Sequence, residues 1–225
     1  MNSQEKNSKV YIFDLDGTLF DSMDLWEKVD AAFFSKRGID MPPDYTKTVI
    51  AMDMRETAAY TIERFGLCED ADDMVREWIE AAAYAYGHTV HMKPHAREYL
   101  RALREAGVVM AIATSLTADL YEPALRANGI MDCFDAFIST TQTPYGKSKP
   151  DVYLMAAEAL NTEPRDCIVF EDILTAIRSA KGAGMTVYAI YDSASGGDWE
   201  QMVIEADGAY RDFHDVPLPD GKKLL

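Results

Sequence analysis

The clearest candidates for catalytic residues are Asp14 and Asp16, which follow the apolar run at residues 10–13. A β-prone apolar run that ends in carboxylates and a glycine is typical of a buried strand that opens into a turn. Side chains at positions i and i+2 share one face of a strand, so Asp14 and Asp16 project the same way if strand geometry persists. Gly17 then allows the backbone to turn sharply.

Two neighbouring carboxylates at a strand end are costly unless a cation holds them or one is protonated. Mg²⁺ takes carboxylate oxygens and keeps water and phosphate oxygens as its other ligands. The pair therefore indicates a nucleophilic carboxylate beside an acid/base carboxylate, with a metal between protein and substrate. The structural alternative is a polar turn, because Asp and Gly are ordinary turn residues.

Composition limits the partners. The chain has 225 residues, 48% of them hydrophobic, and a formal net charge of −16. Such an acidic chain is poorly suited to binding nucleic acid through its phosphates. Three cysteines far apart indicate reduced thiols, and the polar N-terminus lacks the apolar stretch of a signal peptide. No apolar run approaches about 18 residues, so we expect no membrane span and a cytoplasmic protein.

The elements expected from periodicity fall into two groups. Helices are predicted at residues 23–37, 54–65 and 71–86, with Asp21 and Ser22 as candidate caps of the first, and no strand is expected between about 22 and 90. After residue 93, strands and helices alternate, and the strands are apolar throughout. This pattern predicts an α/β fold: a Rossmann-like, doubly wound, mainly parallel sheet core with an inserted all-helical block. The expected domains are residues 1–19 with 92–225, and residues 20–91.

Further polar groups fall at or near the predicted strand ends, where open parallel sheets bind ligands. They are Thr114 and Ser115, Lys147, and the pair Glu171 and Asp172. With Asp14 and Asp16 they suit phosphoryl transfer to a carboxylate, in which positioning and charge neutralisation do most of the catalysis. Taken singly, each group has a structural alternative as a helix cap, a loop lysine or an acidic helix start.

The order and spacing of four segments resemble the motifs of the haloacid dehalogenase superfamily. These segments are Asp14-x-Asp16-Gly17-Thr18, Ala113-Thr114-Ser115, Lys147-x-x-Pro150-Asp151 and Phe170-Glu171-Asp172. The helical block is similar to the helical cap of that superfamily. The chain looks most like the branch that holds small-molecule phosphatases and β-phosphoglucomutases.

The resemblance implies a covalent mechanism at the first motif. Asp14 would attack phosphorus and carry the aspartyl-phosphate, and Asp16 would protonate the leaving oxygen and then deprotonate water. Asp172 would bind Mg²⁺ together with Asp14 and the backbone carbonyl of Asp16, and Glu171 would orient or share that site.

The other motifs would hold the phosphoryl group. Thr114 and Ser115 would hydrogen-bond its oxygens, and Lys147 would neutralise charge. Lys147 is preferred to Lys149 because the usual pattern is K-P-x-P-D, and Lys147 lies four residues before Asp151.

The helical block should decide specificity. Arg55 is a candidate for the substrate's phosphate or polar groups, although a helix-surface arginine paired with an acidic residue is the alternative. Trp26 stands where β-phosphoglucomutases typically carry a histidine, and tryptophan cannot shuttle protons. We therefore expect a Mg²⁺-dependent phosphomonoesterase acting on a small, sugar-phosphate-like metabolite, as a monomer or weak homodimer. A hexose-phosphate mutase is the alternative, and a non-catalytic metabolite-binding module is the third possibility.

Overall fold

The computed structural model describes residues 9–49, 52 and 54–224, and the chain divides into two compact units. The first, here called the sheet unit, joins the chain up to Met23 with the chain from His91 onward. The second, the helical unit, comprises Asp24–Val90. A short antiparallel pair, β2 (Phe20–Asp21) with β3 (His91–Met92), keeps both connecting segments with the sheet unit.

The sheet unit contains six parallel strands in the order β5-β4-β1-β6-β7-β8. This arrangement confirms the predicted Rossmann-like α/β fold. Strand β1 lies centrally because its uninterrupted apolar residues are buried on both faces. The strand bounds are β1 (Val10–Phe13), β4 (Met110–Thr114), β5 (Ala136–Ser139), β6 (Cys167–Glu171), β7 (Thr186–Ile190) and β8 (Gly208–Tyr210).

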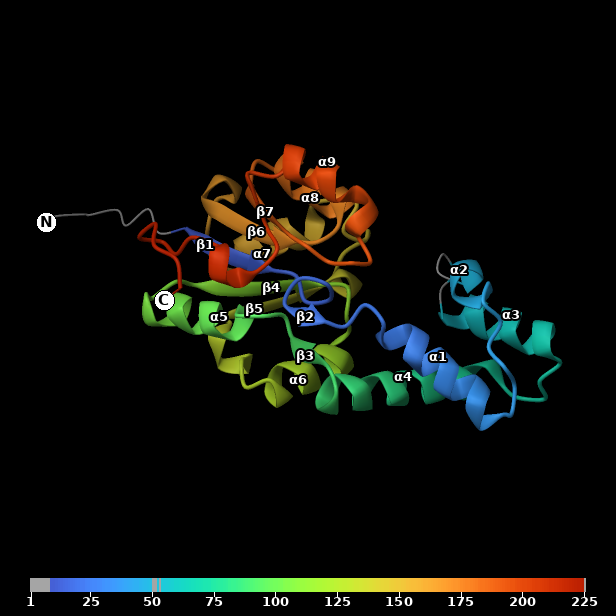
Figure 1. Ribbon diagram of the computed structural model, residues 1–225. Helices are drawn as coiled ribbons and strands as arrows, with labels where there is room; N and C mark the ends of the chain where they lie inside the picture. Colours follow the sequence, from blue (N-terminus) through green and yellow to red (C-terminus); the bar gives the residue numbers. More distant parts are fainter. Residues whose placement is uncertain (1–8, 50–51, 53, 225) are drawn as a thin grey trace, which may run out of the picture. The chain divides into compact units, whose positions relative to one another are not determined.

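Alternate residues of β1 face two different cores. Val10 and Ile12 belong to an aliphatic cluster with residues of α7 (Asp151–Ala159), α8 (Leu174–Gly182) and α9 (Trp199–Glu205). Tyr11 and Phe13 face an aromatic layer, in which Phe13 stacks on Phe170 with ring centres 4.3 Å apart. Helices α5 (Ala96–Glu105) and α6 (Ala118–Ala127) cover the sheet face opposite α7 to α9 (Figure 1). Packing on both faces of the sheet fixes the positions of the strand ends, and the candidate site residues lie at these ends.

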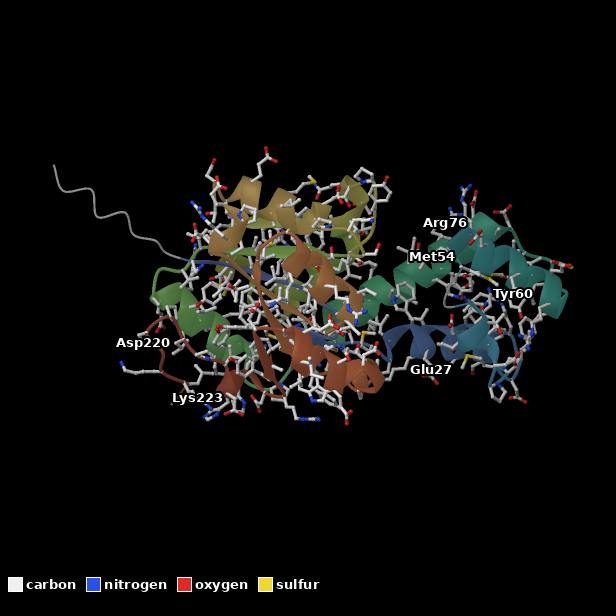
Figure 2. The ribbon with its side chains drawn as sticks, turned by 90° about the horizontal axis from the view of Figure 1, so that it is seen from above. Glu27, Met54, Tyr60, Arg76, Asp220 and Lys223 are labelled. Atoms are coloured by element: carbon white, nitrogen blue, oxygen red, sulfur yellow. The ribbon has the colours of Figure 1, made fainter. Side chains whose placement is uncertain are left out.

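The helical unit consists of α1 (Leu25–Lys36), α2 (Tyr45–Val49), α3 (Met54–Phe65) and α4 (Ala71–His88). Its core is aromatic: Phe33 contacts Trp78 with ring centres 5.2 Å apart, and Phe34 contacts Tyr45 at 4.8 Å. Charged side chains such as Glu27 and Arg76 lie outside that core and are exposed (Figure 2). Within the described ranges, we find no helix with the length and apolar character that a membrane crossing requires.

Several local expectations were wrong. Helix α1 begins after Asp24, not at the predicted caps; Asp21 lies in β2 and Ser22 bonds to Asp16 instead. Helix α4 continues through Gly87 to His88, because glycine only weakens a helix whose apolar face is packed. The short strands β2 and β3 and the five-residue α2 were not predicted, since elements of this length have no periodic signal.

Candidate active site

The first loop is shaped by Gly17. Strand β1 ends at Phe13, and the Asp14 N–H still donates to the Phe170 carbonyl at 3.1 Å. Gly17 adopts a φ of +76°, and a Cβ atom there would lie 2.2 Å from Oδ2 of Asp172. Only glycine satisfies both the positive φ and the lack of space for a Cβ atom, so the backbone at Gly17 lies directly against the Asp172 carboxylate of the last motif.

The two aspartates of the first motif have different surroundings. Asp14 is buried, whereas Asp16 is half-buried and its Oδ1 accepts a hydrogen bond from Ser22 Oγ at 2.5 Å. Because β1 ends before both residues, strand alternation does not determine the direction of Asp16. The Ser22 hydroxyl holds that carboxylate instead.

Lys147 joins two motifs by direct contact. Its Nζ donates to Oδ1 of Asp14 and to Oε1 of Glu171, the latter at 2.6 Å. A turn closed by the Lys149 N–H and the Gly146 carbonyl, 3.1 Å apart, shapes the loop that carries it. Lys149 itself is exposed. Of the two candidate lysines, Lys147 is the one that reaches the Asp14 carboxylate.

The acidic pair at the end of β6 completes the cluster. One carboxylate oxygen each from Asp14, Glu171 and Asp172 lies within 4.8 Å of the others. The Tyr153 hydroxyl donates to Oε1 of Glu171 at 2.6 Å, and Thr18 Oγ1 donates to Oδ1 of Asp172 at 3.1 Å. The side chains of Glu171 and Asp172 are fully buried. The structure therefore places three carboxylates and one ammonium in one small buried volume.

The cluster shifts the proton affinities of its members. Burial raises the pKa of Glu171 to about 7, with the Lys147 ammonium opposing this shift. Burial, with the Asp14 and Glu171 carboxylates adding to its effect, also raises the pKa of Asp172 well above its usual range. Burial alone would lower the pKa of Lys147, but the two carboxylates it contacts raise it overall. The site thus favours additional positive charge.

These residues fit a divalent cation. Three carboxylates and one ammonium leave an excess of two negative charges when all are ionised, and hard oxygen donors suit a cation of the magnesium type. Asp14, Glu171 and Asp172 could hold such an ion. The carboxylate of Asp16 is not part of this group.

The hydroxyl pair follows β4. Phe13 pairs with Ile112, so Thr114 ends its strand at the same sheet edge as Asp14. Thr114 is buried, and its Oγ1 accepts from the Leu116 N–H at 3.1 Å. Ser115 is exposed, and Ser139 Oγ donates to the Leu116 carbonyl at 2.8 Å, which fixes the loop around it.

Arg55 lies on α3 of the helical unit. Its guanidinium is 2.9 Å from Oδ1 of Asp72, and the side chain is 77% exposed. The surface ion pair considered as an alternative from the sequence is therefore present.

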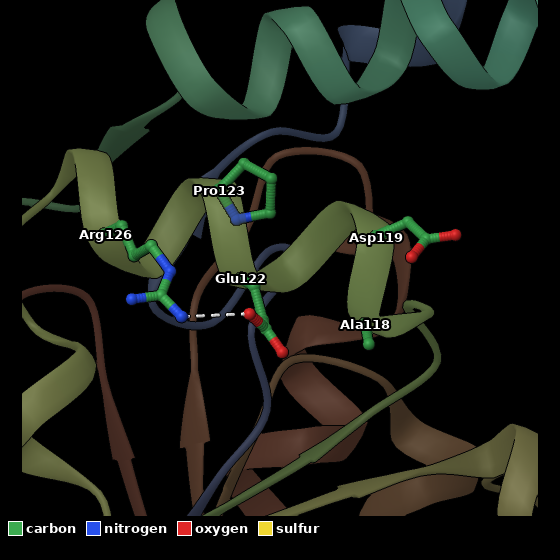
Figure 3. Close-up of a pocket in the computed structure, with 5 residues that line it drawn as sticks. All are labelled: Ala118, Asp119, Glu122, Pro123 and Arg126. Carbon is green, nitrogen blue, oxygen red and sulfur yellow. Dashed lines mark hydrogen bonds and ion pairs between the residues drawn. The ribbon is translucent and has the colours of Figure 1, made fainter.

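A shallow hollow of about 440 Å³ lies elsewhere, along α6 (Figure 3). All its described lining residues belong to that helix, and two of them, Glu122 and Arg126, form an ion pair at 3.1 Å. None of the predicted site residues lines it. This hollow has no group with an evident catalytic role.

Sequence reasoning missed three side chains that contact the cluster. Tyr153 lies two residues after the Asp151 that ends the third motif, which is a weak signal. Thr18 was part of the first motif but had no assigned contact. Ser195, whose Oγ donates to Oδ2 of Asp172 at 3.3 Å, comes from a loop that had no distinguishing sequence feature.

Fold and cluster together define an α/β enzyme with polar groups gathered at the carboxyl ends of parallel strands. A model of the haloacid dehalogenase-like hydrolase family matches residues 11–190. The chain therefore belongs to this family, and the predicted family membership is confirmed.

Among curated proteins, two similar relatives are phosphatases. Validoxylamine A 7'-phosphate phosphatase of Streptomyces hygroscopicus subsp. limoneus is 28% identical over 211 residues, covering 94% of this chain and 97% of that protein. Hexitol phosphatase B of Escherichia coli K12 is 28% identical over 179 residues, covering 77% and 79%. The prediction of a hydrolase of the phosphoric-monoester class is confirmed by these relationships.

Solved structures share the fold. CbbY of Rhodobacter sphaeroides in complex with xylulose-1,5-bisphosphate has a TM-score of 0.76 at 20% identity, covering 96% of this chain and all of that one. A β-phosphoglucomutase of Clostridium difficile has a TM-score of 0.67 at 19% identity, covering 91% of both chains. At these identities the likeness concerns the fold alone.

Proposed function

We propose that this protein is a Mg²⁺-dependent phosphomonoesterase that hydrolyses a small, sugar-phosphate-like metabolite through an aspartyl-phosphate on Asp14. The observation that carries the proposal is the contact of Lys147 with both Asp14 and Glu171 beside Asp172. A nucleophilic carboxylate held by an ammonium at a cation site is what phosphoryl transfer to a carboxylate requires.

The reaction has two steps. In the first, an oxygen of Asp14 attacks phosphorus, the bond from phosphorus to the substrate oxygen breaks, and Asp16 gives that oxygen its proton. In the second, water attacks the phosphorus of the aspartyl-phosphate, Asp16 takes a proton from this water, and the Asp14 carboxylate is restored. The Ser22 hydroxyl keeps Asp16 oriented for both transfers.

Charge and position come from the surrounding groups. Lys147 neutralises the attacking carboxylate and the phosphoryl oxygens, and Ser115 presents an exposed hydroxyl. Thr114 accepts rather than donates in its described side-chain bond, so its proton can go to a phosphoryl oxygen. Asp14, Asp172, the backbone carbonyl of Asp16 and Glu171 would hold Mg²⁺, which supplies further neutralisation of phosphoryl charge.

Residues 20–91 would act as the cap domain that selects the substrate, with Arg55 as a candidate contact. Arg55 would then have to give up its ion pair with Asp72, and the loss of that exposed pair itself costs little. The names of the two curated relatives support a polyhydroxylated phosphate as substrate. We propose a cytoplasmic monomer or weak homodimer, which light scattering at several concentrations would test.

The decisive experiment measures phosphate release from p-nitrophenyl phosphate and a panel of sugar phosphates, with and without Mg²⁺. Asp14→Asn should abolish turnover, and rapid acid quench of the wild type should leave one phosphoryl group on the peptide that contains Asp14. Asp21→Asn is the matched control, because this nearby aspartate is exposed and lies in β2. An active Asp14→Asn enzyme would rule out Asp14 as the nucleophile.

The same panel separates the alternatives. Conversion of glucose 1-phosphate to glucose 6-phosphate without phosphate release would establish the mutase in place of the phosphatase. Binding of sugar phosphates with no turnover at all would establish a binding module.

A further inference from the structure

The carboxylate of Asp172 receives a hydroxyl donor on each oxygen. Thr18 Oγ1 donates to Oδ1 at 3.1 Å, and Ser195 Oγ donates to Oδ2 at 3.3 Å. Thr18 belongs to the first motif, whereas Ser195 comes from the loop between β7 and α9. Two donors on opposite oxygens fix the plane of a carboxylate and favour its charged form.

The loop that carries Ser195 is held by a buried ion pair. Lys93 Nζ donates to Oδ2 of Asp192 at 2.7 Å and to the Tyr191 carbonyl at 2.6 Å. The Lys93 and Asp192 side chains are only 10% and 4% exposed. Oδ1 of Asp192 also accepts from the Ala194 N–H at 2.8 Å, so the turn that leads to Ser195 is closed by the same carboxylate.

Further contacts hold the loop that carries Ser195. The Lys93 N–H donates to the Leu19 carbonyl at 2.9 Å. Lys93 therefore binds both the end of the first motif's loop, through its backbone, and the loop after β7, through its side chain. The Tyr191 ring packs edge-on against Trp199 at 5.2 Å, and the Arg211 guanidinium lies 4.0 Å from the Tyr191 ring centre. Both ends of the segment 192–198 are therefore anchored.

A buried ion pair contributes little net free energy to folding, because the cost of desolvating the two charges offsets most of their attraction. The Lys93–Asp192 pair is better explained by the position that it imposes on the loop. We propose that Ser195 is a positioning residue for the Asp172 carboxylate, and that Lys93 and Asp192 hold Ser195 in place. This inference rests on the proposed function only in taking Asp172 as a cation ligand.

The test measures Mn²⁺ binding from the electron paramagnetic resonance signal of the free ion, without substrate. Ser195→Ala should raise the Mn²⁺ dissociation constant about 10-fold, at the low end of effects seen when a ligand's supporting hydrogen bond is lost. Ser195→Thr keeps the hydroxyl and should restore binding. Ser193→Ala is the control, since Ser193 is an exposed serine of the same loop.

Lys93→Met extends the test to the ion pair. It should weaken Mn²⁺ binding to a similar degree, and its combination with Ser195→Ala should add little, because both remove the same support. In Mg²⁺ titrations of activity, each variant should need about 10-fold more Mg²⁺ while kcat at saturating Mg²⁺ changes less.

Wild-type Mn²⁺ affinity in Ser195→Ala would overturn the proposal, as would equal losses in Ser195→Ala and Ser193→Ala. Failure of the wild type to bind Mn²⁺ would overturn it too, since Asp172 would then have no cation to hold. If Mn²⁺ binding changes as expected but no sugar phosphate is hydrolysed, the positioning role stands and the proposed reaction fails.

Discussion

Gly17→Ala is the substitution whose effect the structure determines most sharply. The first cost is backbone strain. Gly17 has a φ of +76°, and an alanine with this φ destabilises the folded state by about 1–2 kcal/mol. The second is a collision: the new Cβ would lie 2.2 Å from Oδ2 of Asp172. Ordinary contact begins at 3.4 Å, so the carboxylate must move by 1.2 Å, the difference between these two distances.

That movement breaks the geometry of the cation site. Asp172 is fully buried and held by Thr18 and Ser195, so it cannot swing away without losing those hydrogen bonds. A displacement of about 1 Å in a catalytic group can cost roughly 100-fold in rate. We therefore expect kcat/KM for p-nitrophenyl phosphate to fall about 100-fold, and Mn²⁺ affinity to fall at least 10-fold.

Gly184→Ala provides the matched control. Gly184 has a φ of +83°, but a Cβ there would have no neighbour within 4 Å. Backbone strain should cost both variants about 1–2 kcal/mol of stability, visible as a fall in Tm, and the collision with Asp172 should add a further loss in Gly17→Ala. Only Gly17→Ala should lose cation binding and activity. A Gly17→Ala enzyme with wild-type Mn²⁺ affinity and turnover would refute the reasoning, and so would a Gly184→Ala enzyme that is equally inactive.

Three further predictions concern stability and the cation. Burial, reinforced by the Glu27 carboxylate, raises the pKa of Asp30 from 3.8 to about 6. The native state keeps this proton to a higher pH than the unfolded chain does, so the group's contribution to stability falls as pH rises between about 4 and 6. Asp30→Asn should accordingly raise the free energy of unfolding by about 1–3 kcal/mol above pH 6 and by little near pH 4, as measured by urea unfolding; equal gains at both pH values would count against a buried charge. Tyr153→Phe removes the hydroxyl that donates to Glu171, and should weaken Mn²⁺ binding about 10-fold; an unchanged dissociation constant would show that the hydroxyl does not support the site. Mg²⁺ at about 100 times its dissociation constant should stabilise the wild type by about 2.7 kcal/mol in thermal unfolding, and Asp172→Asn should lose most of this gain; equal stabilisation of both proteins would place the ion elsewhere.

The central sheet could be predicted from the sequence because its strands are apolar runs that end in polar residues. Asp14, Glu171 and Asp172 each follow or end such a run, and parallel topology then brings these strand ends to one edge. The contact of Lys147 with Asp14 needed the motif order as well, since a loop lysine by itself carries no signal.

The remaining contacts depend on tertiary structure. Ser195 lies in a loop of small residues, and only the anchoring of that loop brings it to Asp172. Ser22 was expected as a helix cap because a serine hydroxyl suits a cap as well as it suits a carboxylate, and tertiary contact with Asp16 decided between them. Arg55 could not be assigned from the sequence, because a helix-surface arginine has the same pattern whether it meets Asp72 or a ligand.

The pairing of β2 with β3 brings the two segments that flank the helical unit together like the strands of a hairpin. Phe20 pairs with Met92 and Asp21 with His91 in antiparallel register, so the chain leaves and re-enters the sheet unit through neighbouring backbones. A two-residue Asn-Gly turn is the ordinary way to join such strands. Replacing residues 22–90 by that turn would join β2 directly to β3 and would also remove the Ser22 hydroxyl from Asp16, and a library of other helical inserts could be grafted at the same junction.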